Sequence, residues 1–230
     1  MSEGIVLKRI ARIHSDYKSK FGIPRQSGII EAITATIVFE PEFRNPDSLR
    51  GIEEFSHLWL LWEFSESLRD DWTPMVRPPK LGGNKRVGVF ATRSPFRPNP
   101  IGLSSVRLLH YEPSTPKGPI LTVCGADLLD NTPIYDIKPY LPYTDLHTDA
   151  SGGFALTPDS SPLTVEFSCG VLDNVPGTDC EIISQILSQD PRPGYQSDPD
   201  RIYTFEYGDW RISFKGSKDI ITVTEIIKLY

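Results

Sequence analysis

Apolar and polar positions alternate over short stretches of this chain, and turns rich in Gly, Pro, Asn and Asp separate those stretches. This pattern is typical of a β protein. It predicts strands over 5–13, 29–39, 55–64, 87–92, 103–109, 120–126, 134–137, 163–170, 202–207, 211–214 and 220–229. One helix, over 179–187, is predicted from apolar residues spaced at i, i+1, i+4 and i+5.

The stretch 55–64 is the most apolar of the predicted strands, and its near-continuous run of leucines and aromatics predicts burial on both faces. Residues 41–51 have turn and short-helix character. Residues 144–161 are rich in Gly, Ser, Asp and Pro and lack periodicity, which predicts a domain boundary. We therefore expect a mainly β fold, with an antiparallel β-barrel over 1–160 and a small α+β domain over 161–230.

Composition narrows the class of protein. The chain has 230 residues, of which 39% are hydrophobic and 21 are prolines, so a core fits but a helical bundle does not. The three cysteines and the histidines show no metal-ligand spacing, so we predict no metal and a reducing compartment. No apolar leader and no run of about 18 apolar residues is present, so we expect a cytoplasmic protein without a membrane segment.

Charge is unevenly distributed along the chain. The net charge is −6, yet the interval 72–111 contains no Asp or Glu. Its basic residues are Arg77, Lys80, Lys85, Arg86, Arg93, Arg97 and Arg107. Three prolines stiffen the loop 93–100, and guanidinium groups on a stiff loop suit carboxylate or phosphate. The interval is either a solvated basic face or an anion-binding surface.

The stretch 82–107, which contains Arg93-Ser94-Pro95-Phe96-Arg97-Pro98-Asn99-Pro100, resembles the TsaA-like family, the TrmO-type S-adenosylmethionine-dependent tRNA methyltransferases. Further motifs of that family follow in order at 21–26 (FGIPRQ), 55–59 (FSHLW), 77–79 (RPP), 127–130 (DLLD), 136–140 (DIKPY) and 190–195 (DPRPGY). The resemblance implies the same barrel with a small second domain, and a homodimer whose cofactor site is close to the subunit interface. It also implies methylation of tRNA at the N6 nitrogen of threonylcarbamoyladenosine next to the anticodon.

The resemblance also implies which residues bind the cofactor. They are Pro24, Arg25, Gln26, Ser65, Glu66, Arg93, Leu103, Asp127, Leu128, Leu129 and Asp130. No Gly-rich strand–helix fingerprint is present, so a pocket built on the barrel is expected. Arg25 or Arg93 would pair with the methionine carboxylate, and Asp127 or Asp130 would hold polar groups of the cofactor. On residue type alone, Arg25 is equally a surface arginine, and the two aspartates could instead form only an Asx turn.

Contacts to tRNA are expected from a second set of residues. These are Lys85, Arg86, Arg97, Lys138, Arg192 and Tyr195. The general base is left open between Asp136, Tyr140 and bulk water. We interpret His57 as a histidine held by one hydrogen bond within an apolar strand, and Trp59 and Trp62 as core residues.

Two other functions compete with the methyltransferase hypothesis. The first is an adenosylmethionine-binding module that regulates a partner without transferring a methyl group. The second is an enzyme that acts on a small adenine-containing metabolite. Methyl transfer to tRNA separates the three hypotheses.

Overall fold

The computed structural model describes residues 6–78, 81, 84–155, 162–192 and 198–229. By its internal contacts the chain forms two compact units, and both draw on several parts of the sequence. Unit 1 comprises residues 1–15, 26–72 and 98–146, and unit 2 comprises 16–25, 73–97 and 147–230. The predicted division at residue 160 follows the chain, whereas these units interleave along it.

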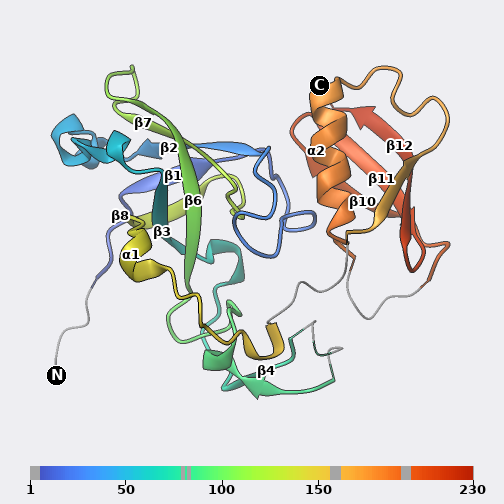
Figure 1. Cartoon of the computed structure of the whole chain (residues 1–230), viewed down its shortest axis with the longest axis horizontal. Coiled ribbons are helices and arrows are strands. Elements are labelled where there is room, and N and C mark those ends of the chain that lie inside the picture. The colour runs from blue at the N-terminus through green and yellow to red at the C-terminus, as the bar shows by residue number, and fades with distance from the viewer. Residues whose placement is uncertain (1–5, 79–80, 82–83, 156–161, 193–197, 230) are drawn as a thin grey trace. The chain divides into compact units, whose positions relative to one another are not determined.

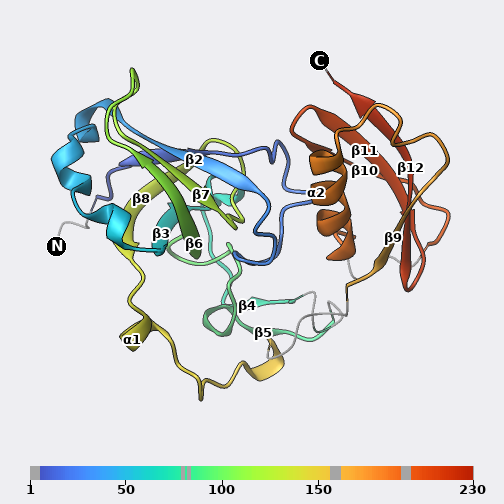
Figure 2. The same ribbon diagram turned by 45° about the horizontal axis from the view of Figure 1, so that its top comes forward.

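Unit 1 is a closed barrel of six strands in the order β1-β2-β7-β6-β3-β8 (Figures 1 and 2). Every neighbouring pair is antiparallel, and β1 closes the barrel against β8. Its strands are β1 Ala11–His14, β2 Thr34–Phe39, β3 His57–Glu63, β6 Ile101–Glu112, β7 Ile120–Cys124 and β8 Thr132–Pro139. The predicted antiparallel β-barrel is confirmed.

Short helical turns follow the barrel strands β2, β3 and β8. Helix α1 spans Pro142–Asp145, and 3₁₀ turns span Pro41–Phe43, Pro46–Leu49, Ile52–Glu54 and Ser65–Ser67. Asn45 caps the second of these turns, because its side-chain oxygen accepts the backbone N–H of Asp47 at 3.0 Å. The short-helix character predicted for 41–51 is therefore confirmed.

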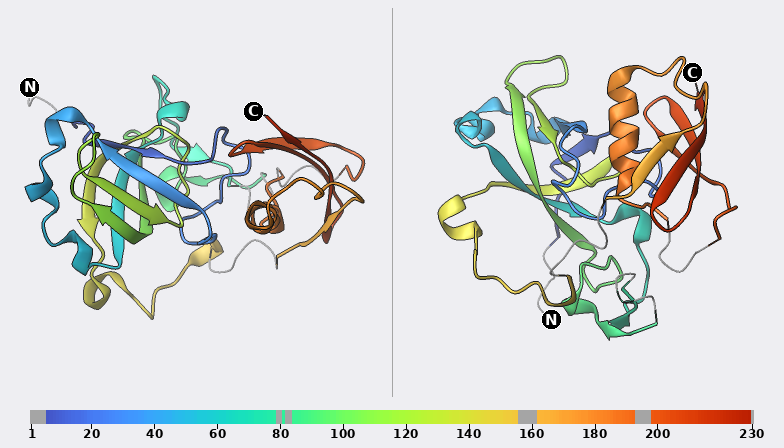
Figure 3. Two further views of the ribbon diagram at one scale, coloured as in Figure 1. Left: turned by 90° about the horizontal axis from the view of Figure 1, so that it is seen from above. Right: turned by 45° about the vertical axis from the view of Figure 1, so that its right-hand side comes forward.

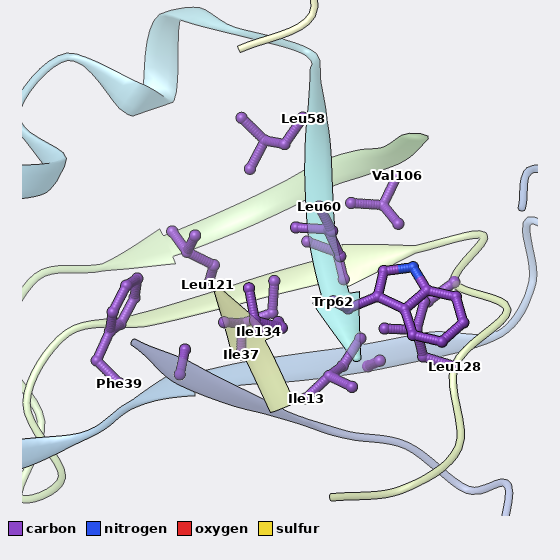
Figure 4. Packing of buried hydrophobic residues seen from close by; sticks show 14 of the residues in the cluster. Ile13, Ile37, Phe39, Leu58, Leu60, Trp62, Val106, Leu121, Leu128 and Ile134 are labelled. Carbon is purple, nitrogen blue, oxygen red and sulfur yellow. The ribbon is translucent and has the colours of Figure 1, made fainter. Parts of the chain in front are cut away.

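Inward-pointing residues of the barrel strands form the core (Figure 4). On β3 the buried positions are Leu58, Leu60 and Trp62, and the residues between them are partly exposed. The prediction that this strand is buried on both faces was wrong. Its outward leucine and tryptophan cover the barrel surface, so the sequence looks uniformly apolar although the burial alternates.

Several predicted strands are shorter in the structure: among the described residues of 5–13 the strand begins only at Ala11, and 163–170 forms a strand only over Thr164–Phe167. In 29–39 the ladder begins only at Thr34, because Gly28 and Ile33 exchange hydrogen bonds with the backbone of Gly125 instead. In 87–92 only Val87–Gly88 (β5) forms a strand, paired with Met75–Val76 (β4). A 3₁₀ turn over Val89–Ala91 follows it.

Unit 2 contains a four-stranded sheet in the order β10-β11-β12-β9, with helix α2 packed along one face (Figure 3). The elements are β9 Thr164–Phe167, α2 Gly177–Ser188, β10 Tyr203–Tyr207, β11 Trp210–Gly216 and β12 Ile220–Lys228, with a 3₁₀ turn at Gly153–Ala155. The predicted helix and the predicted hairpin are confirmed. Ile183, Ile186 and Leu187 are the buried residues of α2.

The segment 16–25 packs against this sheet. Phe21 stacks on Tyr203 and Phe214, with ring centroids 6.3 Å apart in each pair, and meets Phe205 edge-on at 6.4 Å. Gly22 has a φ of 97° and lies so close that a Cβ would approach the Phe205 ring to 2.8 Å. A contiguous piece of the N-terminal sequence therefore completes the aromatic core of unit 2.

The described residues contain neither a membrane-spanning helix nor a cluster of metal-binding side chains. No helix there is both long and apolar enough to cross a membrane. No three His, Cys, Asp or Glu side chains in that part of the chain gather so that they could hold a metal ion.

Candidate active site

Strand β6 extends beyond its neighbour β7 at one rim of the barrel. The ladder between them covers Arg107–Glu112 of β6, whereas β6 itself begins at Ile101. The backbone N–H of Ser105 points to the side that β7 has left and donates to Ser27 Oγ at 3.2 Å. Alternate residues of a strand direct their backbone groups to the same side, so the N–H and C=O of Leu103 also face that side.

The loop that follows β7 lies beside the loop that precedes β2. Gly125 has a φ of 75°, and its carbonyl accepts the N–H of Gly28 at 2.8 Å. After it, Ala126 and Leu128 are buried in the barrel core, and Asp127 between them is partly exposed. The hydrogen bond at Gly125 and the buried side chains of Ala126 and Leu128 therefore hold this loop in place.

Hydrogen bonds hold both carboxylates of this loop. Asp127 Oδ1 accepts the Ser104 hydroxyl at 2.6 Å. Asp130 Oδ1 accepts the backbone N–H of Ser15 at 3.2 Å and lies 3.4 Å from His14 Nδ1. The Ser15 hydroxyl also donates to the Leu128 carbonyl at 2.9 Å. The sequence motif 127–130 is therefore a fixed acidic edge.

The Ser65–Ser67 turn belongs to the same rim. It begins where β3 ends, and the Phe64 N–H donates to the Pro100 carbonyl at 2.9 Å, next to the first residue of β6. Gln26 precedes Ser27, which is bonded to β6. In unit 1 the structure thus brings together the predicted residues Gln26, Ser65, Glu66, Leu103, Asp127, Leu128, Leu129 and Asp130.

The remaining predicted cofactor residues belong to unit 2. Pro24 is buried there, and Arg25 and Arg93 are exposed. The loop around Arg93 is closed by its own hydrogen bonds: the Thr92 hydroxyl donates to the Val89 carbonyl at 2.8 Å, and Arg97 Nη1 donates to the Thr92 carbonyl at 3.2 Å. The predicted stiff loop is present, and Arg97 helps to stiffen it.

The strand register separates the two candidate bases. Asp136 on β8 is opposite Leu61 on β3, and Leu61 is opposite Leu103 on β6. Asp136 therefore shares an outward-facing row with Leu103, about 10 Å away at the usual strand spacing. The backbone N–H of Tyr140 donates instead to the His57 carbonyl. His57 lies four residues before Leu61 on β3, so Tyr140 is about 13 Å from the row of Asp136 and Leu103.

The Asp136 carboxylate has a charged neighbour on its own strand. Lys138 Nζ lies 2.8 Å from Asp136 Oδ2, so the carboxylate has a cationic partner. The residue that precedes Asp136 on β8 is Tyr135. Its pKa is raised to about 12, mainly by burial and then by the hydrogen bond to Glu63. Tyr135 thus stays protonated near neutral pH and donates to Glu63 Oε1 at 2.7 Å.

Of the six predicted tRNA contacts, Arg97 closes the loop around Arg93, and the other described ones fall into three groups. Lys85 and Arg86 are exposed. Lys138 is paired with Asp136. Arg192 is buried, with Nε 2.7 Å from Asp190 Oδ1 and Nη2 3.0 Å from Oδ2, so its guanidinium supports the loop instead of facing outward. Tyr195 and Lys80 lie outside the described residues.

Comparison with known proteins identifies the family. A family model described as the tRNA-methyltransferase O N-terminal domain matches residues 12–146, and one described as the TrmO C-terminal domain matches residues 161–229. The chain belongs to the TrmO family. The candidate rim, from Gln26 to Asp130, lies entirely within the first of these domains.

Relatives and solved structures agree with this assignment. The chain is 41% identical over 196 residues to an Escherichia coli protein named tRNA (adenine(37)-N6)-methyltransferase, a match that covers 82% of this chain and 83% of the relative. It is 40% identical over 226 residues to a Pseudomonas aeruginosa protein named putative S-adenosylmethionine-dependent methyltransferase RcsF, covering 94% and 95%. A crystal structure of TrmO from Pseudomonas aeruginosa superposes with a TM-score of 0.79 at 34% identity, covering 98% and 99%.

Sequence reasoning missed two features of this rim. Ser104, the residue bonded to Asp127, gives no chemical signal by itself because it is a serine within an apolar strand. The signal that could have found it is its place at an inward position, directly after Leu103 in the family motif. The role of the Leu103 backbone depends on where β7 ends, which no residue pattern fixes.

Proposed function

We propose that this protein transfers the methyl group of S-adenosylmethionine to tRNA, at the N6 nitrogen of threonylcarbamoyladenosine next to the anticodon. The observation that carries the proposal is the rim of unit 1, where family motifs far apart in sequence converge on the start of β6. Membership of the TrmO family supports the same reaction.

The rim residues fit adenosylmethionine by the chemistry of their donors and acceptors. Strand-edge amides and carbonyls, such as those of Leu103, suit the edge of an adenine. Fixed carboxylates, such as those of Asp127 and Asp130, suit ribose hydroxyls and cationic groups. Arg25 or Arg93, both in unit 2, stays the predicted partner of the methionine carboxylate. When bound, the cofactor supplies an electrophilic methyl group on a sulfonium.

The residues of the chain contribute positioning and a proton acceptor. The rim holds the methyl donor in one orientation, and holding two reactants in place lowers the barrier of a displacement reaction substantially. Asp136, on the row of Leu103, is the better placed of the two candidate bases. Its carboxylate would take the proton that leaves the acceptor nitrogen, and Lys138 would hold that carboxylate in place.

The oligomeric state and the cellular compartment complete the proposal. The protein works as a homodimer, as the family resemblance implies, and light scattering tests this directly. Large apolar side chains are exposed on the surface, including Val6 at 88% and Tyr143 at 86%, and such side chains suit contact with a second copy. A tRNA substrate places the reaction in the cytoplasm.

The test is incubation with adenosylmethionine labelled in its methyl group and total tRNA. We expect label in tRNA with the wild-type protein and little with Asp127→Asn. Binding of the cofactor without transfer would favour the regulatory module instead. Label confined to small molecules would favour an enzyme of metabolites.

A further inference from the structure

A chain of two hydrogen bonds leads from the buried Trp62 of β3, through Ser104 of β6, to Asp127. The indole Nε1 of Trp62 donates to Ser104 Oγ at 2.9 Å, and Ser104 Oγ lies 2.6 Å from Asp127 Oδ1. An indole N–H only donates, so the Ser104 oxygen accepts from Trp62 and its single proton is directed to the carboxylate. The direction of both bonds is therefore fixed by the residue types.

Close packing holds the Trp62 indole, from which these two hydrogen bonds start. Trp62 is opposite Gly102 on the neighbouring strand, and a Cβ at Gly102 would overlap the indole ring. Phe64 also meets the indole edge-on, with ring centroids 4.4 Å apart. Trp62 is 9% exposed and Ser104 is 1% exposed, so water does not compete for these bonds.

We propose that Ser104 is a positioning residue for adenosylmethionine, because the Trp62–Ser104 chain holds the Asp127 carboxylate in the orientation that binds the cofactor. The inference rests on the proposed function, in which Asp127 contacts the cofactor. A short, charge-assisted bond from a buried hydroxyl restricts the carboxylate before the ligand arrives. Removing the hydroxyl takes away one restraint on the carboxylate, and binding must then supply the order that this bond provided.

The test measures the affinity for adenosylmethionine and for adenosylhomocysteine by calorimetry. Ser104→Ala should weaken both about tenfold, the usual effect of losing one hydrogen bond to a charged group. Trp62→Phe keeps an aromatic ring and removes the N–H, and should weaken both about threefold. The matched control is Trp59→Phe on the same strand, whose indole donates instead to Asp145 at 2.9 Å, and it should leave cofactor affinity unchanged.

A double-mutant cycle separates positioning from general structural damage. In the Asp127→Asn background, Ser104→Ala should weaken affinity by less than about twofold, because the carboxylate it orients is gone. The KM for adenosylmethionine should rise in Ser104→Ala while the KM for tRNA stays constant. Thermal melts of each variant check the fold, and Trp62→Phe carries the test if Ser104→Ala does not fold.

The outcomes distinguish this inference from the proposed function. Weaker binding in Asp127→Asn with unchanged binding in Ser104→Ala would overturn the inference and leave the function intact. Unchanged binding in Asp127→Asn would remove Asp127 from the site and the inference with it. Equal losses from Ser104→Ala in both backgrounds would show a structural role only.

Discussion

At Gly102 the chain has no side chain, and the indole of Trp62 lies where one would stand. This contact joins β3 to β6 at the rim that carries Asp127. It also sets the angle from which the indole reaches Ser104. The glycine is thus required by the packing of a neighbour.

Gly102→Ala should destabilise the protein by about 2 kcal/mol, because the added methyl group overpacks a closed part of the core. It should also weaken cofactor binding, since the indole must move. The matched control is Gly88→Ala, where a Cβ would meet nothing within 4 Å. Thermal unfolding and calorimetry measure the two effects, and equal melting temperatures for both variants would contradict this packing argument.

The sequence indicated some of these residues and not others. Asp127 and Asp130 stand out because two carboxylates in a short motif after a strand have a chemical meaning in the sequence itself. Ser104 and the Leu103 backbone do not stand out. Their importance depends on register and on the point where β7 ends, which are set by pairing across the barrel.

At the scale of elements, the segment 16–25 behaves differently from its neighbours in sequence. Residues before and after it belong to the barrel unit, but its aromatic side chains pack on β10 and β11 of unit 2. Tyr17 forms an antiparallel bridge with Tyr207. The pKa of Tyr207 is raised, mainly because the side chain is buried and then because Asp16 and Asp179 are charged nearby.

Phe21→Ala should destabilise unit 2 by about 2 kcal/mol, less than a fully buried Phe because Phe21 is half-buried. Ile202→Ala, at a residue 59% exposed, is the control and should change stability by less than about 0.5 kcal/mol. Hydrogen exchange of β10 and β11 reports the loss locally. Unchanged exchange in Phe21→Ala would show that the segment only rests on the sheet.

The types and order of the elements followed from periodicity and turn residues, but the grouping of segments into units did not. Residues 16–25 have the pattern of turn and loop. Nothing in that pattern predicts which surface their Phe and Tyr side chains pack against. Such partners are decided by contacts between residues distant in sequence. The same holds for β3, whose outward Trp59 and Leu61 look like core residues in the sequence.

At the scale of the whole molecule, charge is the feature that matters for tRNA. The net charge is −6, which opposes binding of a polyanion. Within the acid-free interval, residues 73–97 belong to unit 2, whereas Arg107 belongs to unit 1 and lies 3.7 Å from Glu31. The exposed pair Lys85 and Arg86 is therefore the better candidate for phosphate contacts.

Reversing the charge at Lys85 and Arg86 should weaken tRNA binding and flatten its salt dependence by up to about two phosphate contacts. Cofactor affinity should stay the same. Reversal at Lys117 and Lys218, two exposed lysines outside this interval, serves as the control. The measurement is tRNA affinity at several salt concentrations, and identical slopes for wild type and the Lys85/Arg86 variant would place the RNA elsewhere.

The central claim is that this chain methylates one defined nucleoside of tRNA. It is tested most directly by mass spectrometry of nucleosides from tRNA incubated with the protein and adenosylmethionine carrying a deuterated methyl group. We expect the label on threonylcarbamoyladenosine alone, and its loss in Asp127→Asn. Label on a different nucleoside, or none on tRNA that carries threonylcarbamoyladenosine, would contradict the account.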